Sequence, residues 1–207
     1  MTGASDVRPI IVLTMGRSGS SMVAGCLALH GMWTGECRPA DRHNPRGYFE
    51  NLRINGALGD LYPGSIYRDL KPAPADQGWP SFVEAVKAQE GYVGGPWLVK
   101  TNAFAWPLWT PFDPVFVFVR RNIDAISASA KRHDPKAPNS PARWREIAQA
   151  HQVEMDGVRA AYGGFDIDSR RLADGDHDQL SAALEAVGLE TDHDAVAAFT
   201  NPALLTH

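Results

Sequence analysis

Residues that could bind an anion gather in one turn near the start of the chain. An apolar run at 10–15 is followed by Gly16, Arg17, Ser18, Gly19, Ser20 and Ser21. A glycine-containing turn between a buried strand and a helix directs several backbone N–H groups at one point, where the helix dipole also favours an anion. Arg17 adds a fixed positive charge, and the two final serines can cap the helix or donate to phosphate oxygens. The less favoured alternative is that the turn, taken alone, is purely structural.

Basic residues also end two later apolar runs. Lys100 closes the run at 97–100, and Arg120 and Arg121 directly follow the run at 115–119. In an open parallel sheet, ligands bind beyond the carboxyl ends of the strands. Three successive strand ends therefore bring cations to the same edge of the sheet, which favours a ligand with several negative charges.

The same strand ends offer little to a magnesium ion. The nucleoside-triphosphatase loop has the pattern GxxxxGK[ST], and here no lysine precedes the serine pair Ser20 and Ser21. A magnesium-dependent phosphotransferase also needs a carboxylate close to its phosphates. Asp166 and Asp168, in a weaker strand pattern at 165–168, are the only counter-evidence. The sequence therefore predicts a multiply anionic ligand that is held without a metal ion.

Short β-branched runs alternate with helical segments along the chain. The predicted strands cover 10–15, 97–100, 115–119 and 165–168. The predicted helices cover 22–30, 52–61, 81–89, 123–133, 142–162 and 179–187. This alternation is typical of an α/β fold whose parallel sheet is covered on both faces. We expect a single domain over residues 1–207, with a central sheet of four to five strands flanked by helices. Residues 1–8 and about 203–207 should be flexible ends.

Size and charge exclude several classes of protein. The 207 residues carry a net charge of −4, whereas a general nucleic-acid binder is normally basic. Cys26 and Cys37 form no metal-ligand spacing, and Cys26 lies among apolar residues, as a buried unreactive thiol does. No stretch approaches membrane-spanning length, and the N-terminus has no signal-peptide pattern. We expect a cytoplasmic protein with no membrane span and no nucleic-acid partner.

Two of the turns resemble the nucleotide-binding motifs of sulfotransferases that use 3′-phosphoadenosine 5′-phosphosulfate (PAPS). Residues 16–21 resemble the 5′-phosphosulfate loop of this family, in which a Lys or Arg begins an (R/K)-S-G-[ST] turn. Arg121 follows a strand and precedes Ser129 by eight residues, which is the spacing of the family's 3′-phosphate motif. The motifs occur in the right order, each at a predicted strand-to-helix turn, so together they are more specific than either alone.

Other segments extend the resemblance over nearly the whole chain. Residues 98–101 look like the family strand that ends Lys-Thr-His, and residues 165–188 look like its late strand and helix. Residues 44–50 resemble the N-P-x-G-Y-[FW]-E stretch of a bacterial branch. The resemblance implies a P-loop-NTPase-like fold, with PAPS as co-substrate and no metal.

The resemblance also implies roles for individual residues. The 5′ end of the nucleotide would be bound by Gly16, Arg17, Ser18, Gly19, Ser20 and Ser21. Arg121 and Ser129 would bind the 3′-phosphate, which separates this donor from ordinary adenylates. Arg17 and Lys100 would stabilise the charge on the sulfuryl group as it is transferred.

The catalytic base departs from the commonest family pattern. Many members use the His of Lys-Thr-His, but this chain has Asn102 at that position, which has no useful basicity. Other branches use a glutamate after the first helix, and Glu36 and Glu50 are the two candidates here. We favour Glu50, which follows aromatic residues, as the base. The alternative is that Glu50 only orders nearby arginines.

The expected acceptor is a hydroxyl, or less readily an amine, of a small molecule, carbohydrate or lipid. Acceptor loops carry no motif of their own, so the sequence specifies neither the acceptor nor the oligomeric state. Two other functions stay open. One is a small P-loop-type nucleotide kinase, and the other is a catalytically degenerate domain that still binds adenosine 3′,5′-bisphosphate (PAP).

Overall fold

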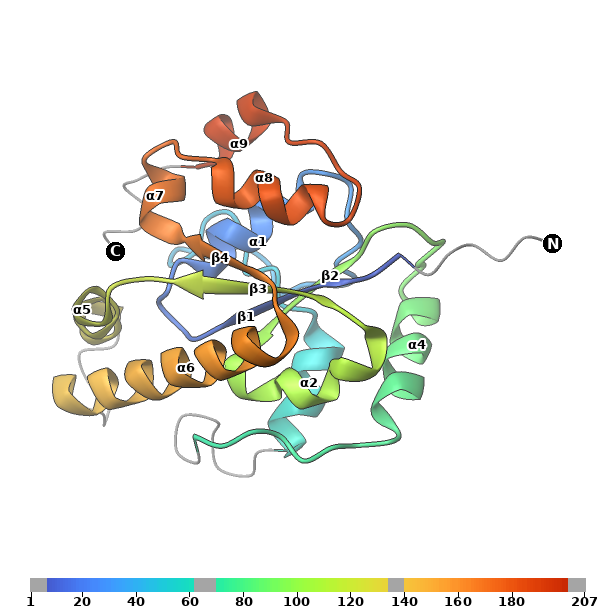
Figure 1. The fold of residues 1–207 in the computed structure, drawn as a ribbon, viewed down its shortest axis with the longest axis horizontal. Helices are drawn as coiled ribbons and strands as arrows, with labels where there is room; N and C mark the ends of the chain where they lie inside the picture. The colour runs from blue at the N-terminus through green and yellow to red at the C-terminus, as the bar shows by residue number, and fades with distance from the viewer. Residues whose placement is uncertain (1–6, 62–69, 134–139, 201–207) are drawn as a thin grey trace.

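Four parallel strands form the centre of the fold, which a computed structural model describes over residues 7–61, 70–133 and 140–200. The strands are β1 (Ile10–Thr14), β2 (Leu98–Asn102), β3 (Val115–Arg120) and β4 (Phe165–Asp168). They lie in the order β2-β1-β3-β4, and Val12 of β1 is level with Lys100 on one side and Val117 on the other (Figure 1). Their β-branched residues suit strands that are buried on both faces.

Helices cover both faces of the sheet (Figure 1). One face carries α1 (Ser20–Ala28), α7 (Ser169–Ala173), α8 (Asp178–Glu185) and α9 (His193–Phe199). The other carries α2 (Leu52–Leu61), α4 (Trp79–Gln89), α6 (Pro141–Tyr162) and the short 3-10 helices η1 (Ala103–Leu108) and η2 (Thr110–Phe112). Helix α5 (Ile123–His133) lies beyond the carboxyl end of β3, beside α6.

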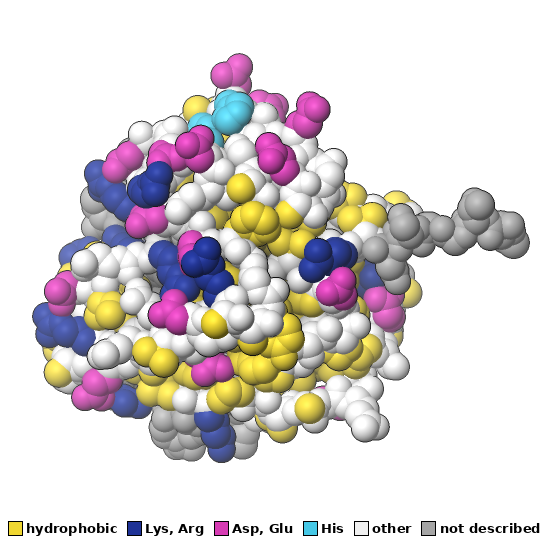
Figure 2. Space-filling model, viewed as in Figure 1, with side chains coloured by type: hydrophobic (Ala, Val, Ile, Leu, Met, Phe, Trp, Pro, Cys, Tyr) yellow, Lys and Arg dark blue, Asp and Glu magenta, His cyan; other side chains and the backbone are white. Residues whose placement is uncertain are grey.

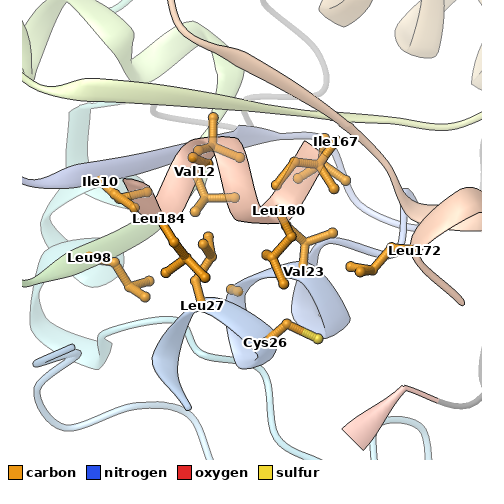
Figure 3. Packing of buried hydrophobic residues seen from close by; sticks show 14 of the residues in the cluster. Ile10, Val12, Val23, Cys26, Leu27, Leu98, Ile167, Leu172, Leu180 and Leu184 are labelled. Atoms are coloured by element: carbon orange, nitrogen blue, oxygen red, sulfur yellow. The ribbon is translucent and has the colours of Figure 1, made fainter. Parts of the chain in front are cut away.

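Successive strand residues divide between two hydrophobic cores, because side chains alternate across a strand. Ile10 and Val12 of β1 pack on the α1 side, and Ile11 and Leu13 pack on the α2 side. Figure 3 shows the first core, in which leucines of α8 and α1 meet the strand residues. Burying each large aliphatic side chain stabilises the fold by roughly 1.5–3 kcal/mol, so the sheet is held between two apolar layers.

The predicted α/β fold with a parallel sheet between helices is confirmed, and the sheet has four strands among the described residues. Helix α1 begins at Ser20, earlier than predicted, because Gly19 adopts a left-handed conformation and ends the preceding loop. The short elements α7, α9, η1 and η2 were not expected from the sequence. Short helices are marginal alone and depend on tertiary packing, so their local sequence carries little signal.

Most of the predicted flexible ends lie outside the described residues. Arg8 is an exception, because it donates a hydrogen bond to the carbonyl of Asp113 at 2.8 Å. No helix in the described part of the chain is long and apolar enough to span a bilayer. Cys26 is fully buried, and burial raises the pKa of its thiol to about 12, which agrees with the predicted unreactive cysteine.

Gly164, between α6 and β4, offers a test of this packing. It has φ +119°, and a Cβ there would come within 2.4 Å of the carbonyl oxygen of Phe116. We expect Gly164→Ala to lower the free energy of unfolding by about 2–4 kcal/mol in denaturant titrations, through backbone strain and overpacking. Gly157→Ala is the matched control: it lies on an exposed helix surface with open space around it. It should stabilise the protein by about 0.5–1 kcal/mol.

Candidate functional site

The loop between β1 and α1 is shaped by hydrogen bonds of its own side chains. The Ser18 hydroxyl donates to the carbonyl of Met15 at 2.9 Å and lies 2.6 Å from the Thr14 hydroxyl. Ser18 is almost fully buried, so its side chain shapes the loop and its hydroxyl does not face solvent. Arg17 (φ 70°) and Gly19 (φ 87°) both adopt left-handed conformations. A non-glycine residue in this region costs energy, and such strain is concentrated at functional sites.

The first turn of α1 directly follows this loop. Gly19 is the N-cap, and no side chain caps the helix there. The amides of a first helical turn have no partner within the helix, and they carry the positive end of its dipole. A left-handed loop therefore ends at the N-terminus of α1, which is the geometry that the predicted anion-binding turn requires.

Lys100 approaches this turn from β2. Its Nζ lies 2.9 Å from Ser21 Oγ and 3.0 Å from Glu50 Oε1, and the side chain is 4% exposed. Burial lowers the pKa of Lys100, and the neighbouring Glu50 carboxylate acts in the opposite direction. The amine thus lies between a hydroxyl of the loop and a carboxylate, and it can donate to an anion bound at the loop.

The two glutamates proposed as bases occupy different places. The Glu50 carboxylate is one-third exposed and pairs with Lys100. Glu36 is exposed, and the interactions recorded for it use its backbone: its N–H donates to Glu90, and its carbonyl accepts from Leu52. The structure therefore brings Glu50, and not Glu36, into contact with the other site residues.

A second cationic group lies on the other side of the loop. Arg121 Nη1 donates to the carbonyl of Arg17 at 2.9 Å, and Arg17 Nε donates to Ser129 Oγ at 3.2 Å. Burial lowers the pKa of Arg121, and the nearby guanidinium groups of Arg17, Arg132 and Arg170 lower it further. The positive field of these three side chains at Arg121 favours an anion there. The two residues of the predicted 3′-phosphate motif and the loop arginine therefore lie together.

Arg120, which was not assigned to the site from the sequence, does not belong to this cluster. Its Nε donates to Asp166 at 2.7 Å, and its Nη2 donates to Asp156 of α6 at 2.7 Å. Arg159 pairs with the second oxygen of Asp166 at 2.8 Å. Basic and acidic side chains accordingly lie side by side over α6 and β4 (Figure 2). Adjacent residues at a strand end point to opposite faces, so only Arg121 reaches the loop.

The two acidic side chains of β4 bind other groups of the fold. Asp166 is held by Arg120 and Arg159, and Asp168 caps α7 by accepting from the N–H groups of Arg170 and Arg171. Neither acid contacts the 16–21 loop in any recorded interaction. Within the described ranges, no group of three or more His, Cys, Asp or Glu side chains could hold a metal ion.

Asn102 has a structural role that the sequence did not reveal. Its Oδ1 accepts from the N–H of Phe104, and its Nδ2 lies 3.0 Å from Nε2 of His151. His151 Nδ1 lies 2.8 Å from the carbonyl of Ile147, so Nδ1 carries the proton and Nε2 accepts from Asn102. The Asn102 side chain thus caps η1 and binds α6, and His151 is fully buried. A histidine distant in sequence gave no local signal for this contact.

Arg132 is a second residue that sequence analysis missed. It contributes to the positive field around Arg121 and lies three residues after Ser129 on α5. Residues three apart share a helix face, so this spacing could have identified it.

A scan of the chain against models of known protein families finds no match, and neither does a search of curated protein sequences. The residues and their geometry therefore carry the case for a function.

Because His151 is buried, we expect the free energy of unfolding to depend on pH. Burial lowers its pKa from 6.5 to about 4. The unfolded chain therefore takes up this proton more readily, and stability falls as pH decreases from 6.5 towards 4. We expect a loss of about 2 kcal/mol between pH 7 and pH 5 from this group. Urea unfolding of wild type and His151→Gln at both pH values measures it. The same pH dependence in the two proteins would contradict the assignment, and exposed His43→Gln is the control.

Proposed function

We propose that this chain is a sulfotransferase with a P-loop-NTPase-like fold that moves a sulfuryl group from PAPS to an acceptor hydroxyl, or less readily an amine. The observation that carries the proposal is the position of the 16–21 loop between two different cationic groups. Lys100, paired with Glu50, lies on one side, and Arg121 with Arg17 and Ser129 lies on the other. PAPS has two anionic ends, and two separated cationic groups on one loop suit such a molecule.

Donor binding would divide between the two sides. The 5′-phosphosulfate would bind at the first turn of α1, where backbone amides and the Ser20 and Ser21 hydroxyls can donate. The 3′-phosphate would lie at Arg121, within the field of Arg17 and Arg132. An arginine fork binds phosphate oxygens in pairs, so this end would distinguish PAPS from adenylates without a 3′-phosphate.

Transfer would then use Lys100 and Glu50 together. The acceptor oxygen attacks sulfur in line, its proton passes to the Glu50 carboxylate, and the bond from sulfur to the bridging oxygen breaks to release PAP. Lys100 would donate to the sulfuryl and bridging oxygens as charge moves onto them, whereas the Arg17 side chain lies with Ser129 on the other side of the loop. Because Lys100 already contacts both Ser21 and Glu50, it can bind the donor and keep the base beside the reacting sulfur.

Removing the Arg121 side chain tests the assignment of the 3′ end. We expect Arg121→Ala to weaken PAP binding by about 100-fold and AMP binding by less than about 5-fold, because charge-assisted hydrogen bonds contribute about 1.5–3 kcal/mol each. Calorimetry measures both ligands, and AMP reports any general damage to the loop whose carbonyl Arg121 binds. Arg145→Ala, an exposed arginine paired with Asp124, is the control. Equal losses for the two nucleotides would refute the assignment.

Neutralising Glu50 tests the base. We expect Glu50→Gln to keep PAP affinity within about twofold and to lower sulfuryl transfer by about 100-fold or more, the usual effect of losing a general base. Transfer from PAPS is followed by PAP release with a panel of sugar, lipid and phenol acceptors. Exposed Glu36→Gln is the matched control and should remain active. An active Glu50→Gln with an inactive Glu36→Gln would reverse the assignment.

The same assays separate the alternative functions. Tight PAP binding without transfer to any acceptor would indicate a degenerate nucleotide-binding domain. Asn102 favours this alternative, because it replaces the family's catalytic histidine and its side chain is bound to His151. ATP turnover that requires magnesium would indicate a nucleotide kinase instead.

A further inference from the structure

The segment that carries Glu50 forms a small two-stranded unit outside the central sheet. The N–H of Arg38 donates to the carbonyl of Glu50, and the N–H of Leu52 donates to the carbonyl of Glu36, both at 2.9 Å. Cys37 and Asn51 form an antiparallel bridge between these bonds. The backbone at residue 50 is therefore fixed by its pairing with residues 36–38. An isolated pair of strands this short is not stable in water and needs support from the rest of the fold.

A buried carboxylate from α4 supplies such support. Glu90 follows α4, its side chain is 7% exposed, and its Oε2 accepts two hydrogen bonds of 2.7 Å. One comes from the backbone N–H of Glu36, and the other comes from Nδ2 of Asn51. Glu90 therefore binds both strands of the unit, at the residue next to Glu50 and at the start of the opposite strand.

Asn51 transmits this contact to the helix that follows. It is 1% exposed, and its Oδ1 accepts from the N–H groups of Arg53 and Ile54 in the first turn of α2. The Asn51 side chain therefore binds α2 through its oxygen and Glu90 through its nitrogen. A side chain held at both ends leaves its neighbour Glu50 little freedom of direction.

The local sequence makes room for the Glu90 carboxylate. A Cβ on Gly35 would lie 2.2 Å from Glu90 Oε2 and 2.4 Å from Asn51 Nδ2. Gly35 also has φ +67°, which other residues rarely adopt. Burying a carboxylate is costly, and Arg53 Nε, 3.6 Å from Oε1, is the one ion-pair partner of Glu90 recorded among the described residues. Glu90 Oε1 is buried without a hydrogen bond among the described residues, so the carboxylate is costly to bury, and its two short bonds at Oε2 point to a positional role.

We propose that Glu90 is a positioning residue that holds Glu50 against Lys100 by binding the Glu36 amide and the Asn51 side chain. The proposal rests on the proposed function, in which Glu50 takes the acceptor proton. Glu90 itself does not touch the reacting atoms in this arrangement. It acts through Asn51 and the strand pairing, from the C-terminal end of α4, which is distant from Glu50 in the sequence.

Three variants separate position from charge. Glu90→Asp keeps the charge but shortens the side chain, so it cannot reach both donors. Glu90→Gln loses the charge but keeps an oxygen that can accept from both. Arg53→Gln removes the long ion pair at Oε1 and the Arg53 hydrogen bond to Gln89, but it leaves both contacts of Glu90 Oε2 in place, so it serves as the control. If Glu90→Asp does not fold, Gly35→Ala displaces the carboxylate by the contact described above and takes its place.

The measurements are PAP affinity, turnover of PAPS and the titration of Lys100. We expect Glu90→Asp to release PAP from PAPS about 10- to 100-fold more slowly, with water or p-nitrophenol as acceptor, because a small displacement of a reacting group costs this much. PAP affinity and the KM for PAPS should stay within about twofold of wild type, since the loop is untouched. Glu90→Gln and Arg53→Gln should behave like wild type.

Nitrogen NMR of labelled lysine, assigned with Lys100→Arg, gives a readout that needs no turnover. If Glu50 moves away, the pKa of Lys100 should fall further, because burial remains and the carboxylate that opposes it is gone. A folded Glu90→Asp with the wild-type Lys100 titration would overturn the positioning role. So would a defect in Glu90→Gln as large as that in Glu90→Asp. If wild type turns over no PAPS, the proposed function fails, while the Lys100 titration still decides whether Glu90 positions Glu50.

Discussion

Lys100 places a buried amino group between the Ser21 hydroxyl and the Glu50 carboxylate. An amine with so little exposure is tolerated only where acceptors surround it, so these two contacts are a condition for a lysine at this position in β2. They join three parts of the chain: the first turn of α1, the middle of β2 and the strand pair around residue 50. The positions of these parts are therefore not independent, and a shift of one changes the surroundings of the other two.

The strand order determines which side chains can meet at the loop. Because β2 and β3 lie on opposite sides of β1, the turn after β1 is flanked by Lys100 on one side and by Arg121 on the other. Open α/β sheets bind ligands where neighbouring connections leave a strand in opposite directions, and this turn occupies such a place. Alternation along β3 then selects Arg121 for the loop, while Arg120 joins the acidic side chains of β4 and α6.

Local sequence was enough to predict the buried strands, the long helices and the turn at 16–21, because β-branched runs, helical periodicity and glycine positions are local signals. It was not enough for contacts between distant segments. His151 reaches Asn102 from α6, and Glu90 reaches Asn51 from α4, and neither residue type is unusual where it stands. The same limit applies to Arg120, since the sequence shows that neighbouring side chains diverge but not which face holds the loop.

The Thr14 and Ser18 hydroxyls lie together and both donate to the Met15 carbonyl, so the loop is shaped by its own hydrogen bonds. A preorganised loop loses little conformational freedom when an anion arrives, so less of the interaction energy is spent on ordering the backbone. If the proposed function is right, nucleotide capture should then proceed in one kinetic phase whose rate grows linearly with concentration. Differences in affinity among nucleotides would appear as differences in residence time, because encounter with the loop is the same for each.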